Sequence, residues 1–184
     1  PDDRRRYPKG FAAKCRKLND AGRVLYVDAS GGGLLQMLGV GDWDTLVAAC
    51  EALVRRPDAV AELMERTTDF HCECLERVLS EVTVDYASFY EPIASNTGPV
   101  ISPQMFERFA LPGYRKVIDL LEARGVRLRI FCTTGGDLSS LLPMLIEAGI
   151  NGLWISNIVS SEMVYSKLRR QLGPEVALIG GIDA

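Results

Sequence analysis

The sequence lacks three features, each of which would define a class of protein. Its 21 Lys and Arg residues are outnumbered by 24 Asp and Glu, and a net charge of −3 excludes a basic nucleic-acid binder. No run of about 18 apolar residues occurs, and the charged start, PDDRRRYPKG, is not followed by an apolar segment of signal-peptide type. We therefore expect a cytoplasmic protein that binds neither nucleic acid nor membranes.

A cysteine pattern typical of secreted proteins is also missing. The odd number of cysteines and the absence of a C-x-x-C pair argue against a disulfide framework. The five are Cys15, Cys50, Cys72, Cys74 and Cys132. With 47% apolar residues among 184, the chain has enough material for one core, and we expect a single domain over residues 1–184.

What the sequence does contain is an alternation of strands and helices. Strands are expected over 23–29, 84–90, 126–132, 152–156 and 176–182. Helices are expected over 11–18 and 44–54, from Pro57, from Ser102, over 113–123, from Asp137, and from Ser160 or Ser161. Such βαβα order predicts a parallel sheet covered by helices, either a doubly wound sheet or a barrel.

Polar or reactive residues stand at or just after every expected strand end, a regularity that favours the barrel. In a (β/α)8 barrel these ends converge on the catalytic face. They are Asp28, Glu91, Cys132 to Thr134, Ser156 with Asn157, and Asp183. The alternative is that strands end where polar residues begin, in any fold. We expect Glu91 and Asp28 to act as acid or base, and Glu91 to lie at a ligand mouth where it contributes little to folding.

Two other motifs resemble binding sites, one for phosphate and one for zinc, but each lacks residues that such a site requires. The segment Ser30–Gly33 is glycine-rich after a strand but completes neither phosphate-binding motif, so a flexible turn is favoured. His71 with Cys72 and Cys74 suggests zinc, yet Cys72 points away from His71 on a helix and no fourth ligand is at hand. A hydrogen-bonded core histidine is the favoured interpretation.

Three segments together resemble the uroporphyrinogen decarboxylase superfamily. They are YEPIASNTGPVISPQMFERFALPGYRKVIDLLEARG, LLPMLIEAGINGLW and LGPEVALIGGIDA, in order and at sensible spacing. The resemblance implies a (β/α)8 barrel with about five of its eight strands present, as a fragment lacking both ends and inactive alone. Members of the superfamily include uroporphyrinogen decarboxylases and methyltransferases that serve methylated corrinoids.

Positions that the resemblance makes functional depart from both activities. The decarboxylase's acidic strand tip falls at Glu91, its substrate-binding serine at Pro92, and its active-site tyrosine near Gln36. The methyltransferase's His-x-Cys zinc ligands fall at Thr133 and Gly135, or one residue earlier at Cys132 and Thr134. Neither placement supplies His-x-Cys, so no metal ligands are predicted from the residues.

The resemblance implies a small anionic substrate, of tetrapyrrole or corrinoid type, bound at the barrel rim. The substrate-binding candidates are Gln36, Cys132, Thr133, Asn157 and Asp183, beside the catalytic candidates Glu91 and Asp28. Corrinoid-linked methyl transfer is favoured, with a corrinoid protein as partner and zinc as the cofactor it could require. Uroporphyrinogen decarboxylation and a non-catalytic binding role are the alternatives, and the full-length protein could form a homodimer.

Overall fold

The computed structural model describes residues 3–133, 135–155 and 163–180. Its strands are β1 (Tyr26–Asp28), β2 (Tyr86–Tyr90), β3 (Ala94–Ser95), β4 (Gly98–Pro99), β5 (Leu128–Thr133), β6 (Gly152–Ile155) and β7 (Ala177–Gly180). Its α-helices are α1 (Phe11–Asp20), α2 (Leu34–Met37), α3 (Trp43–Arg55), α4 (Pro57–Leu79), α5 (Pro103–Phe109), α6 (Leu111–Ala123), α7 (Leu142–Glu147) and α8 (Tyr165–Leu172). Short 3-10 helices η1 (Arg4–Arg6) and η2 (Ser30–Gly32) complete the elements of these residues.

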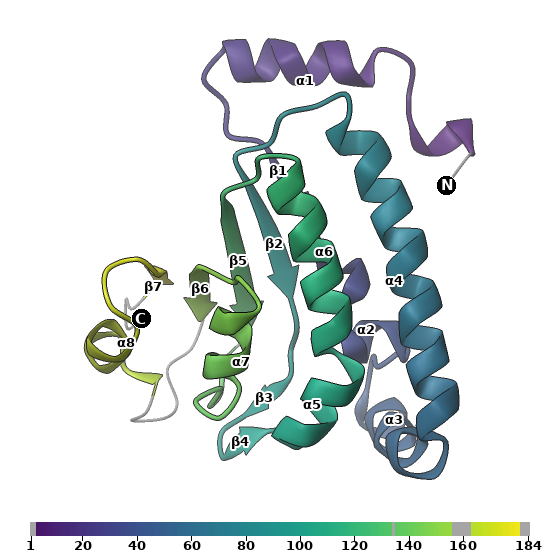
Figure 1. Ribbon diagram of the computed structural model, residues 1–184, viewed down its shortest axis with the longest axis vertical. Coiled ribbons are helices and arrows are strands. Elements are labelled where there is room, and N and C mark those ends of the chain that lie inside the picture. The colour runs from purple at the N-terminus through teal and green to yellow at the C-terminus, as the bar shows by residue number, and fades with distance from the viewer. Residues whose placement is uncertain (1–2, 134, 156–162, 181–184) are drawn as a thin grey trace.

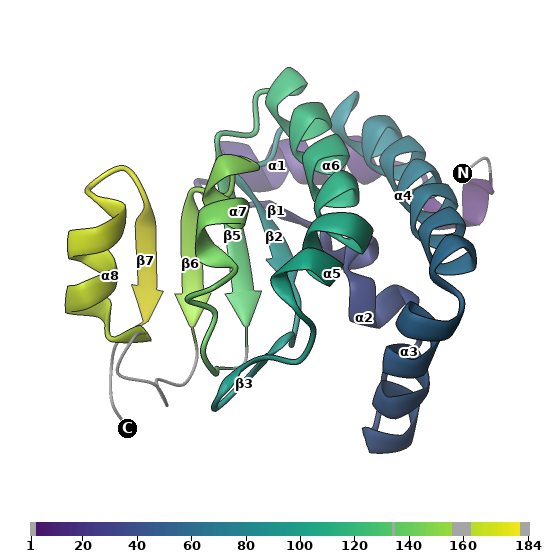
Figure 2. The ribbon, with the colours of Figure 1, turned by 60° about the horizontal axis from the view of Figure 1, so that its bottom comes forward.

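Five strands form one parallel sheet in the order of the chain, β1-β2-β5-β6-β7. The sheet is open, with β1 and β7 at its edges, and β3 pairs with β4 in a separate small hairpin. Helices α4, α6 and α7 lie on one side of the sheet, and α1 crosses near the amino ends of the strands (Figures 1 and 2). This is an arc of a (β/α)8 barrel, which confirms the predicted fold class.

The core lies between the sheet and this helical layer. Side chains on alternate positions of the strands, among them Ala87, Phe89, Phe131 and Leu153, are almost completely buried. Tyr114 on α6 packs against Phe89 and Phe131, with ring centroids 5.4 and 6.1 Å apart. Alternation along each strand therefore separates a helix-covered face from a second face, which the helices leave open.

Several helix starts follow the capping chemistry expected from the sequence. Pro57 occupies the first turn of α4. The Ser102 hydroxyl accepts a hydrogen bond from the Met105 amide at 3.2 Å and begins α5, with Pro103 as its first residue. The helix expected from Asp137 begins only at Leu142, because the Asp137 carboxylate instead accepts the Ser139 amide at 2.8 Å in a preceding turn.

Strand boundaries are narrower than the apolar runs suggested. The first strand starts at Tyr26 rather than Arg23, and the fourth element of the sheet ends, within the described residues, at Ile155. The expected start at Ser160 or Ser161 lies outside the described residues. None of the helices in the described part of the chain combines the length and the apolar character needed to cross a membrane.

Candidate functional site

Glu91 follows β2 and points into the helical layer. Its side chain points to the same side of the sheet as those of Ala87 and Phe89, and it is 0% exposed. Its Oε2 accepts hydrogen bonds from the Leu34 amide at 2.7 Å and the Tyr114 hydroxyl at 3.2 Å, and its Oε1 accepts from the Leu35 amide at 3.1 Å. The expectation that Glu91 lies at an open ligand mouth is wrong, because it is a buried clamp on the first turn of α2.

Burial also changes the acid–base behaviour of this clamp. Desolvation raises the pKa of Glu91 to about 7. The two amides and the Tyr114 hydroxyl stabilise its anion and so oppose this increase in the pKa. Burial, and next the Glu91 charge, raise the pKa of Tyr114 well above its ordinary value. Gly33 leaves room for this carboxylate, since a Cβ there would lie 2.8 Å from Oε2. The result is a carboxyl group that titrates near neutral pH without contacting solvent.

The other predicted rim residues divide between the two faces of the sheet. Thr133 is also buried on the helical side, and its hydroxyl donates to the Gly135 carbonyl at 3.2 Å. Gln36 is exposed on α2. Asn157 and Asp183 lie outside the described residues. Among the predicted site residues that the structure describes, Asp28 and Cys132 are the two that reach the face that the helices leave open.

That open face, which we call the inner face, carries aromatic and polar side chains around a shallow hollow. The hollow has a volume of about 380 Å³. Its lining is Tyr26, Asp28, Tyr86, Ser88, Tyr90, Cys132 and Trp154. Strand register places Tyr90, Cys132 and Trp154 side by side in one row near the carboxyl ends of β2, β5 and β6. Tyr90 and Trp154 remain 45% and 46% exposed, so two aromatic rings flank the thiol.

Asp28 and Cys132 are the chemically reactive groups of the predicted site on this face. One carboxylate oxygen of Asp28 accepts the Ser30 amide at 2.8 Å, which closes the turn after β1. Burial, and next the Asp28 charge, raise the pKa of Cys132 to about 11. The Cys132 thiol is therefore protonated at neutral pH and is not by itself a nucleophile.

His71 lies closer to this site than the sequence indicated. It packs against the η2 turn that follows Asp28, where a Cβ added at Gly31 would lie 2.5 Å from Nδ1. Burial lowers the pKa of His71, while the Asp28 charge and a backbone hydrogen bond at Ala29 raise it. Its Nε2 is buried without a partner, so the expectation of a fully hydrogen-bonded core histidine is wrong.

A model of the family described as Uroporphyrinogen decarboxylase (URO-D) matches residues 35–184, which is most of the chain and includes Glu91, Cys132 and Trp154. The chain belongs to the uroporphyrinogen decarboxylase family. No curated protein matches it. Asp28 and the glycine turn precede the part that the URO-D family matches, so their assignment to the site rests on geometry alone.

The donors that the structure describes on the inner face of this URO-D family member do not fit the zinc site of the corrinoid methyltransferases. Two donors, the Cys132 thiol and the Asp28 carboxylate, share the inner face, whereas catalytic zinc takes three protein ligands. Within residues 3–133, 135–155 and 163–180, no three His, Cys, Asp or Glu side chains cluster as metal ligands. The described residues therefore supply no zinc site.

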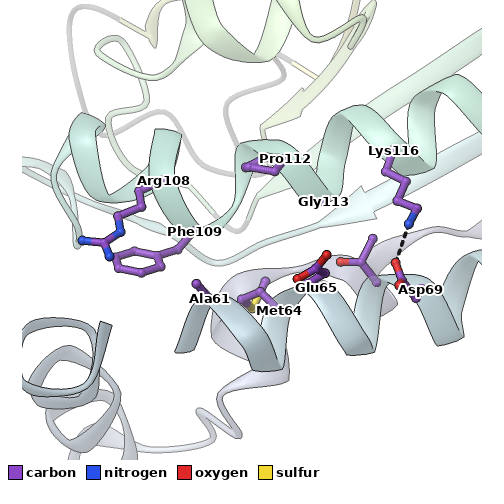
Figure 3. Close-up of a pocket in the computed structure, with 10 residues that line it drawn as sticks. Ala61, Met64, Glu65, Asp69, Arg108, Phe109, Pro112, Gly113 and Lys116 are labelled. Carbon is purple, nitrogen blue, oxygen red and sulfur yellow. Dashed lines mark hydrogen bonds and ion pairs between the residues drawn. The ribbon is translucent and has the colours of Figure 1, made fainter. Parts of the chain in front are cut away.

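A second hollow, of about 310 Å³, lies on the helical side of the URO-D domain (Figure 3). Met64 and Asp69 of α4 face Arg108 of α5 and Lys116 of α6 across it. Lys116 is paired with Asp69, and Arg108 with Asp58 at 3.1 Å. These exposed ion pairs link α4 to α5 and α6. The hollow is lined by residues of these three helices and by no residue of a strand end, where (β/α)8 barrels carry their chemistry.

The sequence interpretation missed the aromatic residues of the inner face, Tyr26, Tyr86, Tyr90 and Trp154, although the residue pattern of β2 indicated them. Barrel interiors are usually filled by Val, Ile and Leu. Here the inner positions of β2 are Tyr86, Ser88 and Tyr90, while Ala87 and Phe89 fill the opposite face. Aromatic and polar residues at alternate positions of a barrel strand indicate an interior that is open to a ligand.

Proposed function

We propose that this chain supplies the ligand-binding wall of a URO-D family enzyme that takes a tetrapyrrole- or corrinoid-type ligand, with corrinoid-linked methyl transfer favoured. The observation that carries the proposal is the row Tyr90, Cys132 and Trp154 on the inner face. Neighbouring strands are spaced about 4.8 Å apart, so the two aromatic residues stand on strands about 10 Å apart with the thiol between them. Flat conjugated rings stack well on such side chains.

Charge on the inner face favours methyl transfer over decarboxylation. A substrate with several carboxylates needs cationic groups to hold it, and the lining of the described hollow contains Asp28 but neither Lys nor Arg. Pro92 also has no hydroxyl to donate. Glu91 has the raised pKa of a general acid, but its complete burial on the helical side separates it from the inner face.

In this proposal the residues of the inner face mainly bind and orient the ligand, and take little part in the reaction itself. The aromatic pair would hold the ring system and exclude water. The Asp28 carboxylate would take the proton of a methyl acceptor whose lone pair attacks the methyl group, while the electron pair of the broken carbon–cobalt bond would stay with the corrinoid. The protonated Cys132 is a neutral contact. A binding-only role is the second candidate, supported by this lack of an activated nucleophile.

Binding of a corrinoid tests the proposal directly. We expect hydroxocobalamin and methylcobalamin to quench tryptophan fluorescence saturably, and Trp154→Leu or Tyr90→Leu to weaken binding at least tenfold. Trp43→Leu, which removes an exposed tryptophan on α3, is the matched control and should bind normally. Tighter binding of uroporphyrin than of cobalamin would support decarboxylation instead, and binding of neither would refute the proposal.

Activity separates the two candidates that remain. Methylcobalamin incubated with the protein and a thiol acceptor should lose its methyl group faster than in buffer, and Asp28→Asn should abolish the difference. Saturable cobalamin binding with no methyl loss would assign the binding-only role.

A further inference from the structure

The Asp28 carboxylate is exposed on the inner face, and its charge is not balanced by a nearby cation. Within residues 3–133, 135–155 and 163–180, no Lys or Arg forms an ion pair with Asp28. The lining of the inner-face hollow contains no basic residue. His71 lies on the helical side, and burial lowers its pKa, so it is mostly neutral at neutral pH. The hollow therefore attracts a cationic ligand.

Aromatic rings around this carboxylate determine which kind of cation fits. Tyr26 and Tyr86 are stacked, with ring centroids 5.1 Å apart and 7° between the ring planes. Tyr90 and Trp154 line the same hollow. The face of an aromatic ring attracts a cation, but a simple ammonium is strongly hydrated. A methylated ammonium has fewer N–H groups to bond with water and buries its methyl groups against the rings, so this lining favours it.

Strand register places a short side chain, Ser88, at the centre of these groups. Asp28 pairs with Ser88 across β1 and β2, while Tyr86 and Tyr90 lie two residues before and after Ser88 on the same face. Paired strands are about 4.8 Å apart, and two residues along a strand span about 6.6 Å. A cation over Ser88 would therefore lie beside the Asp28 strand. A tyrosine would stand in each direction along β2, close to the distance of about 6 Å at which rings attract cations.

We propose that the inner-face hollow binds a methylated ammonium group between Asp28 and the aromatic side chains. This inference rests on the proposed function in one respect, that the inner face is where the ligand binds. It adds the class of the small molecule that would lie beside the corrinoid. The row Tyr90, Cys132 and Trp154 lies next to Ser88 toward the carboxyl ends of the strands, so the two ligands would be neighbours.

Calorimetric titration with choline and with 3,3-dimethyl-1-butanol, in a phosphate buffer free of amines, tests the role of charge. The alcohol has the shape of choline, with carbon in place of the charged nitrogen. Choline should bind saturably and at least tenfold more tightly than the alcohol. Equal affinities, or no saturable binding of choline, would overturn the proposal, because the hollow would then not select a cation.

Substitutions identify the groups that hold the cation. Asp28→Asn keeps an acceptor for the Ser30 amide and should weaken choline binding at least tenfold, whereas Asp44→Asn, at an exposed position on α3, should leave it unchanged. Tyr86→Leu should weaken binding several-fold, and Tyr86→Phe, which keeps the ring, should bind like the parent. Circular dichroism checks that each variant folds. Unchanged binding by Asp28→Asn, or equal losses in the two Tyr86 variants, would overturn the proposal.

Parallel titration with cobalamin separates this proposal from the proposed function. We expect the parent protein to bind both cobalamin and choline. Cobalamin binding without choline binding would overturn the ammonium site and leave the proposed function in place. Choline binding without cobalamin binding would support the ammonium site and refute the corrinoid ligand alone.

Discussion

Glu91 couples the stability of the fold to pH. Its pKa of about 7 in the folded chain lies above the ordinary 4.5, so between these values the folded state holds a proton that the unfolded state has lost. Stability must therefore fall as pH rises through this window. The shift corresponds to a loss of up to about 3 kcal/mol of unfolding free energy.

Denaturant unfolding of Glu91→Gln at several pH values checks this prediction. The neutral side chain cannot ionise, so the variant should lose less stability than the parent between pH 5 and pH 8. Glu107→Gln, at an exposed position on α5, should keep the parent's pH dependence. If the parent instead gained stability over the variant as pH rises, the two amides and Tyr114 would outweigh desolvation, and the pKa assignment would be wrong.

Cys132 should react slowly with alkylating agents at neutral pH. Its pKa of about 11 leaves little thiolate, and the side chain is half-buried between two aromatic residues. Mass spectrometry of each cysteine after timed iodoacetamide treatment should show Cys132 labelled many-fold more slowly than a free thiol, and faster as pH rises. Labelling at the rate of a free thiol at pH 7.5 would return Cys132 to the list of candidate nucleophiles.

The close approach of α4 and α6 depends on a glycine. A Cβ at Gly113 would lie 2.8 Å from the Thr68 Oγ1, which is itself buried without a hydrogen-bond partner. Gly113→Ala should therefore lower the unfolding free energy by about 1–3 kcal/mol through overpacking. Thermal or denaturant unfolding measures this cost.

A double variant identifies the cause of that cost. Thr68→Ala removes the atom that the new methyl group would strike, so combined with Gly113→Ala it should cost less than the two single changes added together. Thr68→Val, which replaces the unpartnered hydroxyl with a methyl group, should be neutral or slightly stabilising. Additive effects would mean that this contact does not limit the packing of the two helices.

Across the whole molecule, the sheet exposes its inner face and both edge strands. Tyr26, Tyr90 and Trp154 present apolar surface there, so the 184-residue chain should bind a hydrophobic dye under native conditions. Replacing Tyr90 and Trp154 with Ser should reduce dye fluorescence several-fold, while Trp43→Ser on α3 should reduce it little. Absence of dye binding by the well-folded parent would mean that the inner face is covered in solution.

Local chemistry was enough to predict most of the elements and their order. Proline and serine at helix starts, glycine at helix ends and β-branched or aromatic runs identified the helices and the parallel strands. The strand order follows, because right-handed βαβ connections place successive strands side by side. Boundaries were less accurate, as at α7, where the Asp137 side chain stabilises a turn instead of capping the helix.

The sequence alone also determined the family, since the acidic strand tip, the restarted helix and the glycine-rich ending occur in order along one chain. Only the tertiary structure decided which way the described strand-end residues point, among them Asp28, Glu91 and Cys132. Successive side chains of a strand point to opposite faces of the sheet. A shift of one residue along the strand therefore moves a side chain from the core under the helices to the open face. For this reason Glu91 is buried under the helices, where it binds the first turn of α2. Asp28 and Cys132 lie on the inner face, with Tyr90 and Trp154 on either side of the thiol.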